Sequence, residues 1–264
     1  MKNSRFIKYP VITFLALQLY STMPLSANYS LDDIDSEQYQ VHYNKLPSVE
    51  NSDQLLKSRA SQFSHVLQEA EKIVLKHEME GYAGLRLIHS HFSVGKNQVM
   101  LEHPEKFEGV SSLITYAQDI DVAKEKKALP ASWIFKGARP EERFVYETST
   151  DPSVHAGVKL LQERPTFVEE IKDLLLATQF NSLLSLALLK RESLVAKEDD
   201  VFMELNSGEL KKSIVQPWNV QTNPIDYFRT SWSFKGPKQQ GCIKVSTCVK
   251  VLGKHAEIYI HKNI

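Results

Sequence analysis

The feature that most constrains the fold of this chain is a change of hydrophobic period near residue 81. Between residues 53 and 80, apolar residues recur at alternating spacings of four and three, which places them on one face of a long helix. This apolar stripe consists of Leu56, Ala60, Phe63, Leu67, Ala70 and Val74. We expect Ser52 to cap the helix and Gly81 to end it. From residue 84 the pattern changes to the two-residue alternation of strands, and separate helical and strand stretches indicate an α+β fold.

Two β-hairpins are expected in the region that follows. Residues 84–93 and 98–103 form two strand-like runs joined by a short turn. Residues 132–136 and 143–147 form a second pair, rich in aromatic and β-branched side chains that can pack across strands. The charged stretch 119–127 between the two pairs is expected to be a solvated loop or a short helix.

A second long helix is expected at residues 166–194, where the apolar run is nearly continuous. Thr166 and Glu169 have the spacing of a capping box, so we expect the helix to begin there. Polar residues interrupt the run before it reaches the roughly 20 apolar residues that a bilayer requires, so we interpret it as a buried helix. The sequence therefore predicts a single α+β domain over 53–264, with antiparallel hairpins packed against two long amphipathic or apolar helices. Its last strands are expected at 231–234, 243–247, 249–251 and 257–261.

The N-terminus has the three parts of a secretory signal peptide. A basic start without acidic residues precedes an apolar run at 11–19, and Ala27 ends the segment. We expect cleavage after Ala27, which would give a secreted or periplasmic mature protein. Leu25 lies at position −3 of this site and is larger than the small residue usually found there, which leaves an uncleaved anchor as the alternative. The polar residues 28–52 are expected to form a flexible mature N-terminus.

The charge balance argues against binding to nucleic acid. The chain has 32 basic and 32 acidic residues, and the expected leader would remove only basic ones. A nearly neutral surface lacks the basic patch that phosphate backbones require. We also find no Gly-x-Ser-x-Gly turn, no His-Glu-x-x-His helix, no phosphate-binding glycine loop and no dinucleotide fingerprint. The sequence therefore leaves open whether the protein is an enzyme.

The sharpest candidate site is the pair His89 and His91. Residues two apart on a strand point to the same face, so the two imidazoles can share one metal ion. Either Glu102 or His103 on the facing strand would lie on the same side, depending on the register, and would supply a third ligand. The alternative is that both histidines are half-buried strand residues hydrogen-bonded to their neighbours.

The only two cysteines are Cys242 and Cys248, and in an exported chain a disulfide is the default expectation. A straight strand would separate their Cα atoms by ~20 Å, far beyond the limit of ~7 Å for a bridge. The bridge therefore requires residues 243–247 to fold back as a loop. If they form a strand instead, the cysteines are free thiols, metal ligands or partners of another chain. His255 follows them as a further candidate ligand, or as a surface histidine.

The run from Gly84 to Phe92, with residues 130–133 further on, resembles a pattern in a family of uncharacterised microbial proteins. That family shows a Leu-x-His-x-His-Phe strand early in the chain and, more loosely, a cluster like Cys242, Cys248 and His255 near the end. The resemblance spans roughly residues 80–261 and implies that both clusters belong to one domain. It brings no established activity.

Two hypotheses follow. In the first, the protein is an exported metal-binding protein, with zinc as the metal that mixed imidazole and thiolate ligands favour. Its candidate ligands are His89, His91, His103 and His255, joined by the two cysteines if these are not bridged. In the second, it is a non-enzymatic secreted interaction or virulence-type factor whose apolar stripe docks a protein partner. Packing of that stripe within the chain is the alternative to docking.

Overall fold

The computed structural model of the protein describes residues 29–107, 109–139, 142–194, 200–207, 211–219, 227–234, 242–251 and 254–260. The leader expected at 1–27 lies outside them. In chain order the helical elements are η1 (Leu31–Asp33), α1 (Ser36–Tyr43), α2 (Val49–Ser58), α3 (Ala60–Lys76), α4 (Ile120–Glu125), α5 (Pro152–Glu163) and α6 (Pro165–Ala177). The strands are β1 (Ala83–Leu87), β2 (Gln98–Phe107), β3 (Val110–Asp119), β4 (Leu129–Phe135), β5 (Arg143–Ser149), β6 (Leu184–Leu188), β7 (Asp200–Ser207), β8 (Lys212–Asn219), β9 (Tyr227–Phe234), β10 (Cys242–Val251) and β11 (Lys254–Ile260).

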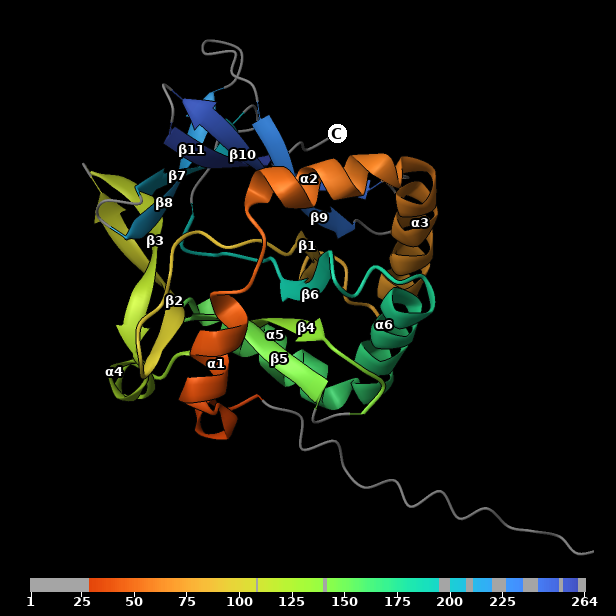
Figure 1. The fold of residues 1–264 in the computed structure, drawn as a ribbon, viewed down its shortest axis with the longest axis horizontal. Helices are drawn as coiled ribbons and strands as arrows, with labels where there is room; N and C mark the ends of the chain where they lie inside the picture. The colour runs from red at the N-terminus through yellow and green to blue at the C-terminus, as the bar shows by residue number, and fades with distance from the viewer. Residues whose placement is uncertain are drawn as a thin grey trace, which may run out of the picture.

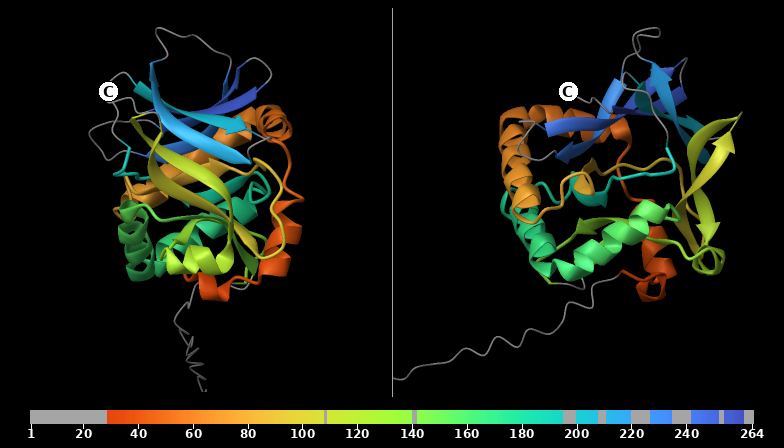
Figure 2. Two further views of the ribbon diagram at one scale, coloured as in Figure 1. Left: turned by 90° about the vertical axis from the view of Figure 1, so that its left-hand side faces the viewer. Right: turned by 180° about the vertical axis from the view of Figure 1, so that it is seen from behind.

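The strands pair into one sheet that closes on itself (Figures 1 and 2). Its neighbours run in the order β1-β6-β4-β5-β2-β3-β8-β7-β11-β10-β9, and β9 pairs back onto β1. Most neighbours are antiparallel, but β2 runs parallel to β5 and β7 runs parallel to β10. The expected mixture of helices and strands is confirmed, whereas the sheet is mixed and not built from antiparallel hairpins alone.

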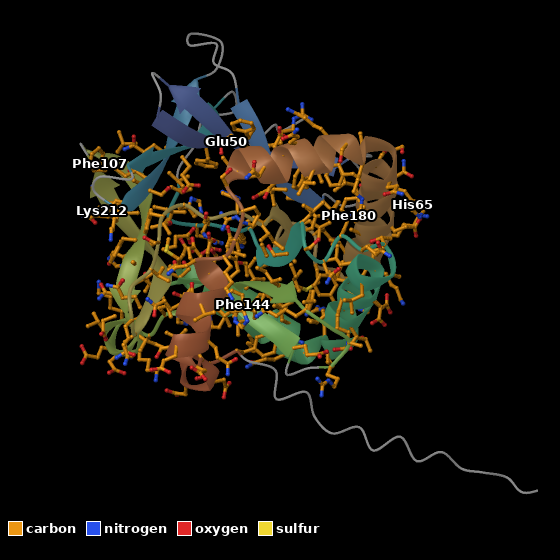
Figure 3. The ribbon with its side chains drawn as sticks, viewed as in Figure 1. Glu50, His65, Phe107, Phe144, Phe180 and Lys212 are labelled. Carbon is orange, nitrogen blue, oxygen red and sulfur yellow. The ribbon has the colours of Figure 1, made fainter. Side chains whose placement is uncertain are left out.

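Helices cover the outer face of β1, β6 and β4. Figure 1 shows α3 and α6 running side by side, with α2 crossing near one end of α3. Their apolar faces bury one large core together with alternate residues of those strands, including Leu85 and Trp133. Phe180, beside the end of α6, belongs to the same core (Figure 3).

The first expected helix is divided in two. The chain leaves the helical conformation at Arg59 (φ −118°, ψ 26°), which separates α2 from α3. The guanidinium of Arg59 donates to the carbonyls of Thr178 and Gln179 at 2.8 and 2.9 Å, and it lies 3.9 Å from the ring centre of Phe180. These contacts tie the break to the end of α6. The expected caps are also wrong, because Ser48 caps α2 and α3 ends at Lys76.

The apolar stripe nevertheless faces inward for most of its length. Leu56, Ala70 and Val74 are buried, and Phe63 and Leu67 pack partly buried against the same core, while Ala60 is exposed. This helix face is therefore occupied within the chain. The docking hypothesis loses the feature that motivated it.

The second expected helix ends much earlier than residue 194. Pro165 opens α6, with no side-chain cap from Thr166, and the helix ends at Ala177. Gln179 takes a left-handed φ of 58°, and the leucine-rich residues that follow form β6. A strand buried on both faces is as continuously apolar as a buried helix, so periodicity alone does not separate the two.

The hairpin expected from 84–93 and 98–103 is wrong. β1 ends at Leu87 and pairs with β6 and β9, while β2 pairs with β3 and β5. Residues 88–97 form a connecting segment instead of a tight turn. Its backbone is held by the N-terminal helical region, because the N–H of Ser90 donates to the Pro47 carbonyl at 2.8 Å. The N–H of Val94 likewise donates to the side chain of Asn44 at 2.8 Å.

Other expectations are confirmed. β4 and β5 form the second hairpin, with Trp133 opposite Val145, and α4 is the short helix expected within 119–127. β9 and β11 correspond to the strands expected at 231–234 and 257–261, whereas the two strands expected at 243–247 and 249–251 form the single strand β10. The strands β3, β7 and β8 were not anticipated.

The segment expected to be a flexible N-terminus carries η1, α1 and the start of α2. Tyr39 and Tyr43 on α1 are buried against Phe144 and Tyr146 of β5. The Tyr39 hydroxyl also donates to the Tyr146 carbonyl at 2.9 Å. Among the described residues, no helix has the length and apolar character needed to cross a membrane.

Candidate functional site

The inward face of the closed sheet carries buried polar side chains. Along β1, Leu85 and Leu87 join the core under the helices, so Arg86 between them points to the opposite, interior side. Its cross-strand partners are Ser185 on β6 and Ser231 on β9, which face the same way. Arg86 is 4% exposed, and both serines are fully buried. A charged group in such a place requires partners of opposite charge.

Arg86 begins a chain of contacts that we call the interior cluster, made of Arg86, His91, Glu147, Glu204 and Ser213. The guanidinium of Arg86 is paired with Oε2 of Glu147. His91 lies between the two carboxylates. Its Nε2 is 3.3 Å from Oε1 of Glu147 and its Nδ1 is 3.1 Å from Oε1 of Glu204. The hydroxyl of Ser213 donates to the same oxygen of Glu204.

Three separate parts of the chain build this cluster. Glu147 lies on β5 opposite Ser132 of β4, Glu204 lies on β7, and His91 belongs to the segment after β1. The side chains of His91, Glu147 and Glu204 are only 2, 4 and 3% exposed. Closure of the sheet therefore brings together residues that are far apart in the sequence.

His89 lies next to His91, with ring centres 4.7 Å apart and an interplanar angle of 62°. Its Nδ1 is 2.9 Å from the carbonyl oxygen of Leu87. A carbonyl only accepts hydrogen bonds, so Nδ1 carries the proton and a neutral ring keeps its lone pair on Nε2. The backbone of His89 is fixed by the hydroxyl of Tyr146, which donates to its carbonyl and accepts from its N–H.

Within the described part of the chain, the charges of the interior cluster balance if a proton or a metal ion joins Arg86. Two carboxylates face one guanidinium, and a buried net negative charge is costly. A proton on His91 would let the ring donate to both carboxylates. A bound metal ion would provide the same compensation.

A second buried ion pair lies on the same interior face. Glu102 of β2 is 3% exposed and accepts from Arg191 at 2.5 Å and from Ser149 at 2.7 Å. It stands opposite Thr115 of β3, which in turn stands opposite Ser213 of β8. Thr115 thus separates Glu102 from Ser213 of the interior cluster. The charge of Glu102 is compensated by Arg191.

His103 faces away from the interior cluster. Its Nδ1 is 2.7 Å from the hydroxyl of Thr150, and burial together with the charge of Lys126 lowers its pKa. Of the two residues that could have lain on the side of the histidine pair, Glu102 points into the closed sheet and His103 points out of it, because side chains alternate along β2. The expectation that His103 could join His89 and His91 is not met by this geometry.

Cys242 and Cys248 both belong to β10, and His255 belongs to β11. The backbone of residues 243–247 is a strand with bulges, pairing with β9, so a bridge would need this strand to fold back. The side chains of all three residues lie outside the described part of the chain. The disulfide and the role of His255 stay predictions.

Sequence reasoning found the two histidines but missed Glu147 and Glu204. Glu147 ends the strand run 143–147, whose other residues are mostly apolar, and a charged residue at a strand end normally indicates solvent. β7 was not predicted, so nothing drew attention to Glu204. One signal of a polar interior is present in the sequence, namely the charged residue Arg86 between Leu85 and Leu87 in an otherwise apolar strand.

In the described part of the chain, no three His, Cys, Asp or Glu side chains are already gathered tightly around one point as metal ligands. Metal binding at the interior cluster therefore requires a small movement of the side chains. Comparison with family models, curated proteins and solved structures finds no match to this chain.

Proposed function

We propose that the protein binds one divalent metal ion, with zinc as the best candidate, inside its closed sheet. The ligands would be His89, His91 and Glu147. The observation that carries this proposal is the buried contact of 3.3 Å between Nε2 of His91 and Oε1 of Glu147. Two ligand atoms that each lie ~2.1 Å from a tetrahedral zinc are separated by ~3.4 Å, so these atoms already have the spacing of neighbouring ligands.

The surroundings of both rings support the same assignment. Metal-bound histidines almost always donate their other ring N–H to a carboxylate or a carbonyl. His91 has Glu204 at its Nδ1, and His89 has the Leu87 carbonyl at its Nδ1. In each ring this leaves Nε2 as the ligand atom. Glu204 is then a positioning residue for His91 and not a ligand.

Arg86 and Ser213 would hold the two carboxylates, Glu147 and Glu204, in place around the metal ion. Arg86 pairs with Oε2 of Glu147, so Oε1 remains the oxygen that faces His91. Ser213 donates to Glu204 and fixes the carboxylate that orients the ring. Three protein ligands leave the fourth position of a tetrahedral zinc for water or a substrate, which is the arrangement of catalytic zinc sites.

Calorimetric titration of chelator-treated protein with Zn²⁺ tests the proposal. The native chain should bind one equivalent, and His89→Ala should weaken binding at least ~100-fold because a ligand is lost. His103→Ala is the matched control, since it removes a half-buried histidine of strand β2 that faces away from the interior cluster. Absence of stoichiometric binding by the native chain would contradict the proposal, as would equal losses in the two variants.

We further propose that the protein is exported by its N-terminal segment. The support is the three-part pattern of residues 1–27, with its basic start and apolar run. Expression of the full chain with a C-terminal tag should give a mature protein beginning at Asn28, found outside the cytoplasm. An intact N-terminus on a cytoplasmic product would contradict the export proposal without bearing on the metal site.

A further inference from the structure

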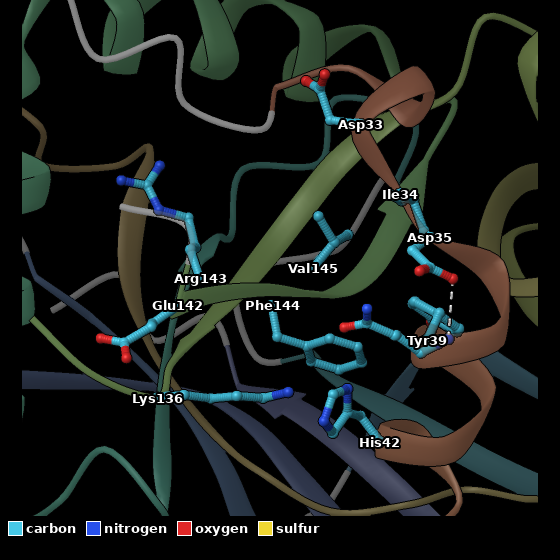
Figure 4. A pocket seen from close by; sticks show the side chains of 11 residues that line it. Asp33, Ile34, Asp35, Tyr39, His42, Lys136, Glu142, Arg143, Phe144 and Val145 are labelled. Carbon is cyan, nitrogen blue, oxygen red and sulfur yellow. Dashed lines mark hydrogen bonds between the residues drawn. The ribbon is translucent and has the colours of Figure 1, made fainter. Parts of the chain in front are cut away.

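A second candidate site lies in a cleft between α1 and the loop end of the β4–β5 hairpin. The cleft has a volume of about 130 Å³, several times the ~30 Å³ that a water molecule occupies in the liquid. The ring of Phe144 forms its apolar wall on one side, and Ile34 lies on the other (Figure 4). Lys136 and His42 bring nitrogen atoms to it.

Lys136 and His42 both contact the ring of Phe144. The ammonium of Lys136 lies 4.6 Å from the ring centre, and the imidazole of His42 meets the ring edge-on at 5.4 Å. Figure 4 shows both side chains directed toward the same side of the cleft. Burial lowers the pKa of Lys136, and burial followed by the charge of Lys136 lowers the pKa of His42. The charge of Lys136 is therefore felt by His42 beside the ring of Phe144.

The acidic side chains at the cleft are committed elsewhere. Asp35 caps α1, accepting the N–H groups of Glu37 and Gln38 at 3.0 and 3.1 Å. Glu142 accepts from the guanidinium of Arg139 at 2.8 Å and from its N–H at 3.1 Å.

The third acid, Asp33, points away from Phe144 in Figure 4. Among the described residues, no acid forms an ion pair with the ammonium of Lys136. Within the described part of the chain, the cleft thus presents the ammonium of Lys136 without an acidic partner beside the ring of Phe144.

We propose that this cleft binds a small organic carboxylate, independently of the metal site. The carboxylate would lie between Lys136 and His42, and its apolar end would lie against Phe144. A hydrogen bond from the ammonium of Lys136 to the carboxylate would be charge-assisted and therefore stronger than a neutral one. The lining combines the basic residues Lys136, His42 and Arg143 with the ring of Phe144, which suits an anion with an organic tail better than an inorganic ion.

Acetate is the probe for the test, and acetamide is its uncharged control of the same shape. Binding is followed by NMR through the ring protons of His42 in metal-free protein. We expect acetate to shift these signals to saturation at millimolar concentration, and acetamide to leave them unchanged. Lys136→Gln should weaken acetate binding at least tenfold, whereas Lys136→Arg should stay within about threefold because the charge is kept.

Lys106→Gln provides the matched surface control, because it removes an exposed lysine from β2 and should leave binding unchanged. Three outcomes would overturn the proposal. These are equal binding of acetate and acetamide, equal affinity of acetate for the native chain and Lys136→Gln, and tighter binding of methylammonium than of acetate. The last outcome would show that the acidic residues of the lining, and not Lys136, determine the sign of the charge that the cleft binds.

Discussion

Glu204 separates the two roles that a carboxylate can have beside a metal-bound histidine. In the proposed site it orients His91 through Nδ1 and touches no metal, so its loss should weaken binding less than the loss of a ligand. We expect Glu204→Gln to lower zinc affinity about 10- to 100-fold. Competition with a chelator of known affinity measures the change. A loss as large as that of His89→Ala would identify Glu204 as a ligand itself.

His103 should make stability depend on pH. Burial, and then the charge of Lys126, lower its pKa in the folded state, so between that value and the ordinary value of about 6.5 the unfolded chain binds more protons. Stability is therefore complete above about pH 6.5 and declines as the pH falls through this window. Denaturant midpoints at pH 7 and pH 5 should differ less in His103→Gln than in the native chain.

The control for this experiment is His65→Gln, which removes an exposed histidine from α3 (Figure 3). It should leave the difference between the two midpoints unchanged. An unchanged difference in His103→Gln as well would assign the pH dependence to other groups. One of these is His42, whose pKa is lowered by its burial and then by the charge of Lys136.

At the scale of elements, Asp151 joins α5 to the segment after β6. It caps the helix by accepting the N–H of Ser153 at 2.9 Å, and its other oxygen accepts from the N–H and hydroxyl of Ser193. The residue is fully buried. Asp151→Ala should cost about 2–4 kcal/mol, because a cap is lost and buried donors are left unsatisfied.

Ser48→Ala provides the comparison for that loss. Ser48 caps α2 through a single exposed bond of 3.4 Å to the N–H of Asn51, so its removal should cost no more than about 1 kcal/mol. Urea denaturation of both variants gives the two values. Equal costs would mean that the contacts of Asp151 with the segment after β6 contribute nothing beyond capping.

The elements that the sequence predicts correctly are those with local signals. β4 and β5 alternate, have aromatic residues and are joined by a short connection, so both their existence and their pairing are predictable. β6 is predicted as helix because an apolar run of five leucine-rich residues has no period of its own. The pairing of β1 fails for another reason, since its partners β6 and β9 are about 100 and 150 residues away.

The same distinction applies to the candidate site. His89 and His91 are recognisable as candidate ligands because they stand two residues apart in the sequence. Glu147 and Glu204 are 57 residues apart and meet His91 only because the sheet closes. Local pattern therefore identifies the two histidines, and the topology of the whole sheet provides the two glutamates.

At the scale of the whole molecule, closure depends on how near β9 can approach β1. Gly84 stands opposite Ser233 of β9 and Ala187 of β6. A Cβ atom at Gly84 would overlap the carbonyl oxygen of Trp232 and would lie 2.6 Å from Cδ1 of Leu189. Only glycine fits there without separating the strands, so this residue allows the sheet to close beside Arg86.

Gly84→Ala should therefore cost about 3 kcal/mol, because the overlap is with backbone that cannot rotate away. Gly81→Ala is the matched control three residues earlier. Gly81 has a φ of 76°, and a Cβ atom added there would have no neighbouring atom within 4 Å, so its substitution costs only the backbone strain of about 1 kcal/mol. Hydrogen exchange should show a loss of protection in β9 for Gly84→Ala alone. Since Arg86 lies two residues from Gly84 on the same face, zinc affinity should fall with closure in that variant and stay native in Gly81→Ala. Native zinc affinity and native β9 protection in Gly84→Ala would show that closure at β1 and β9 does not support the interior cluster.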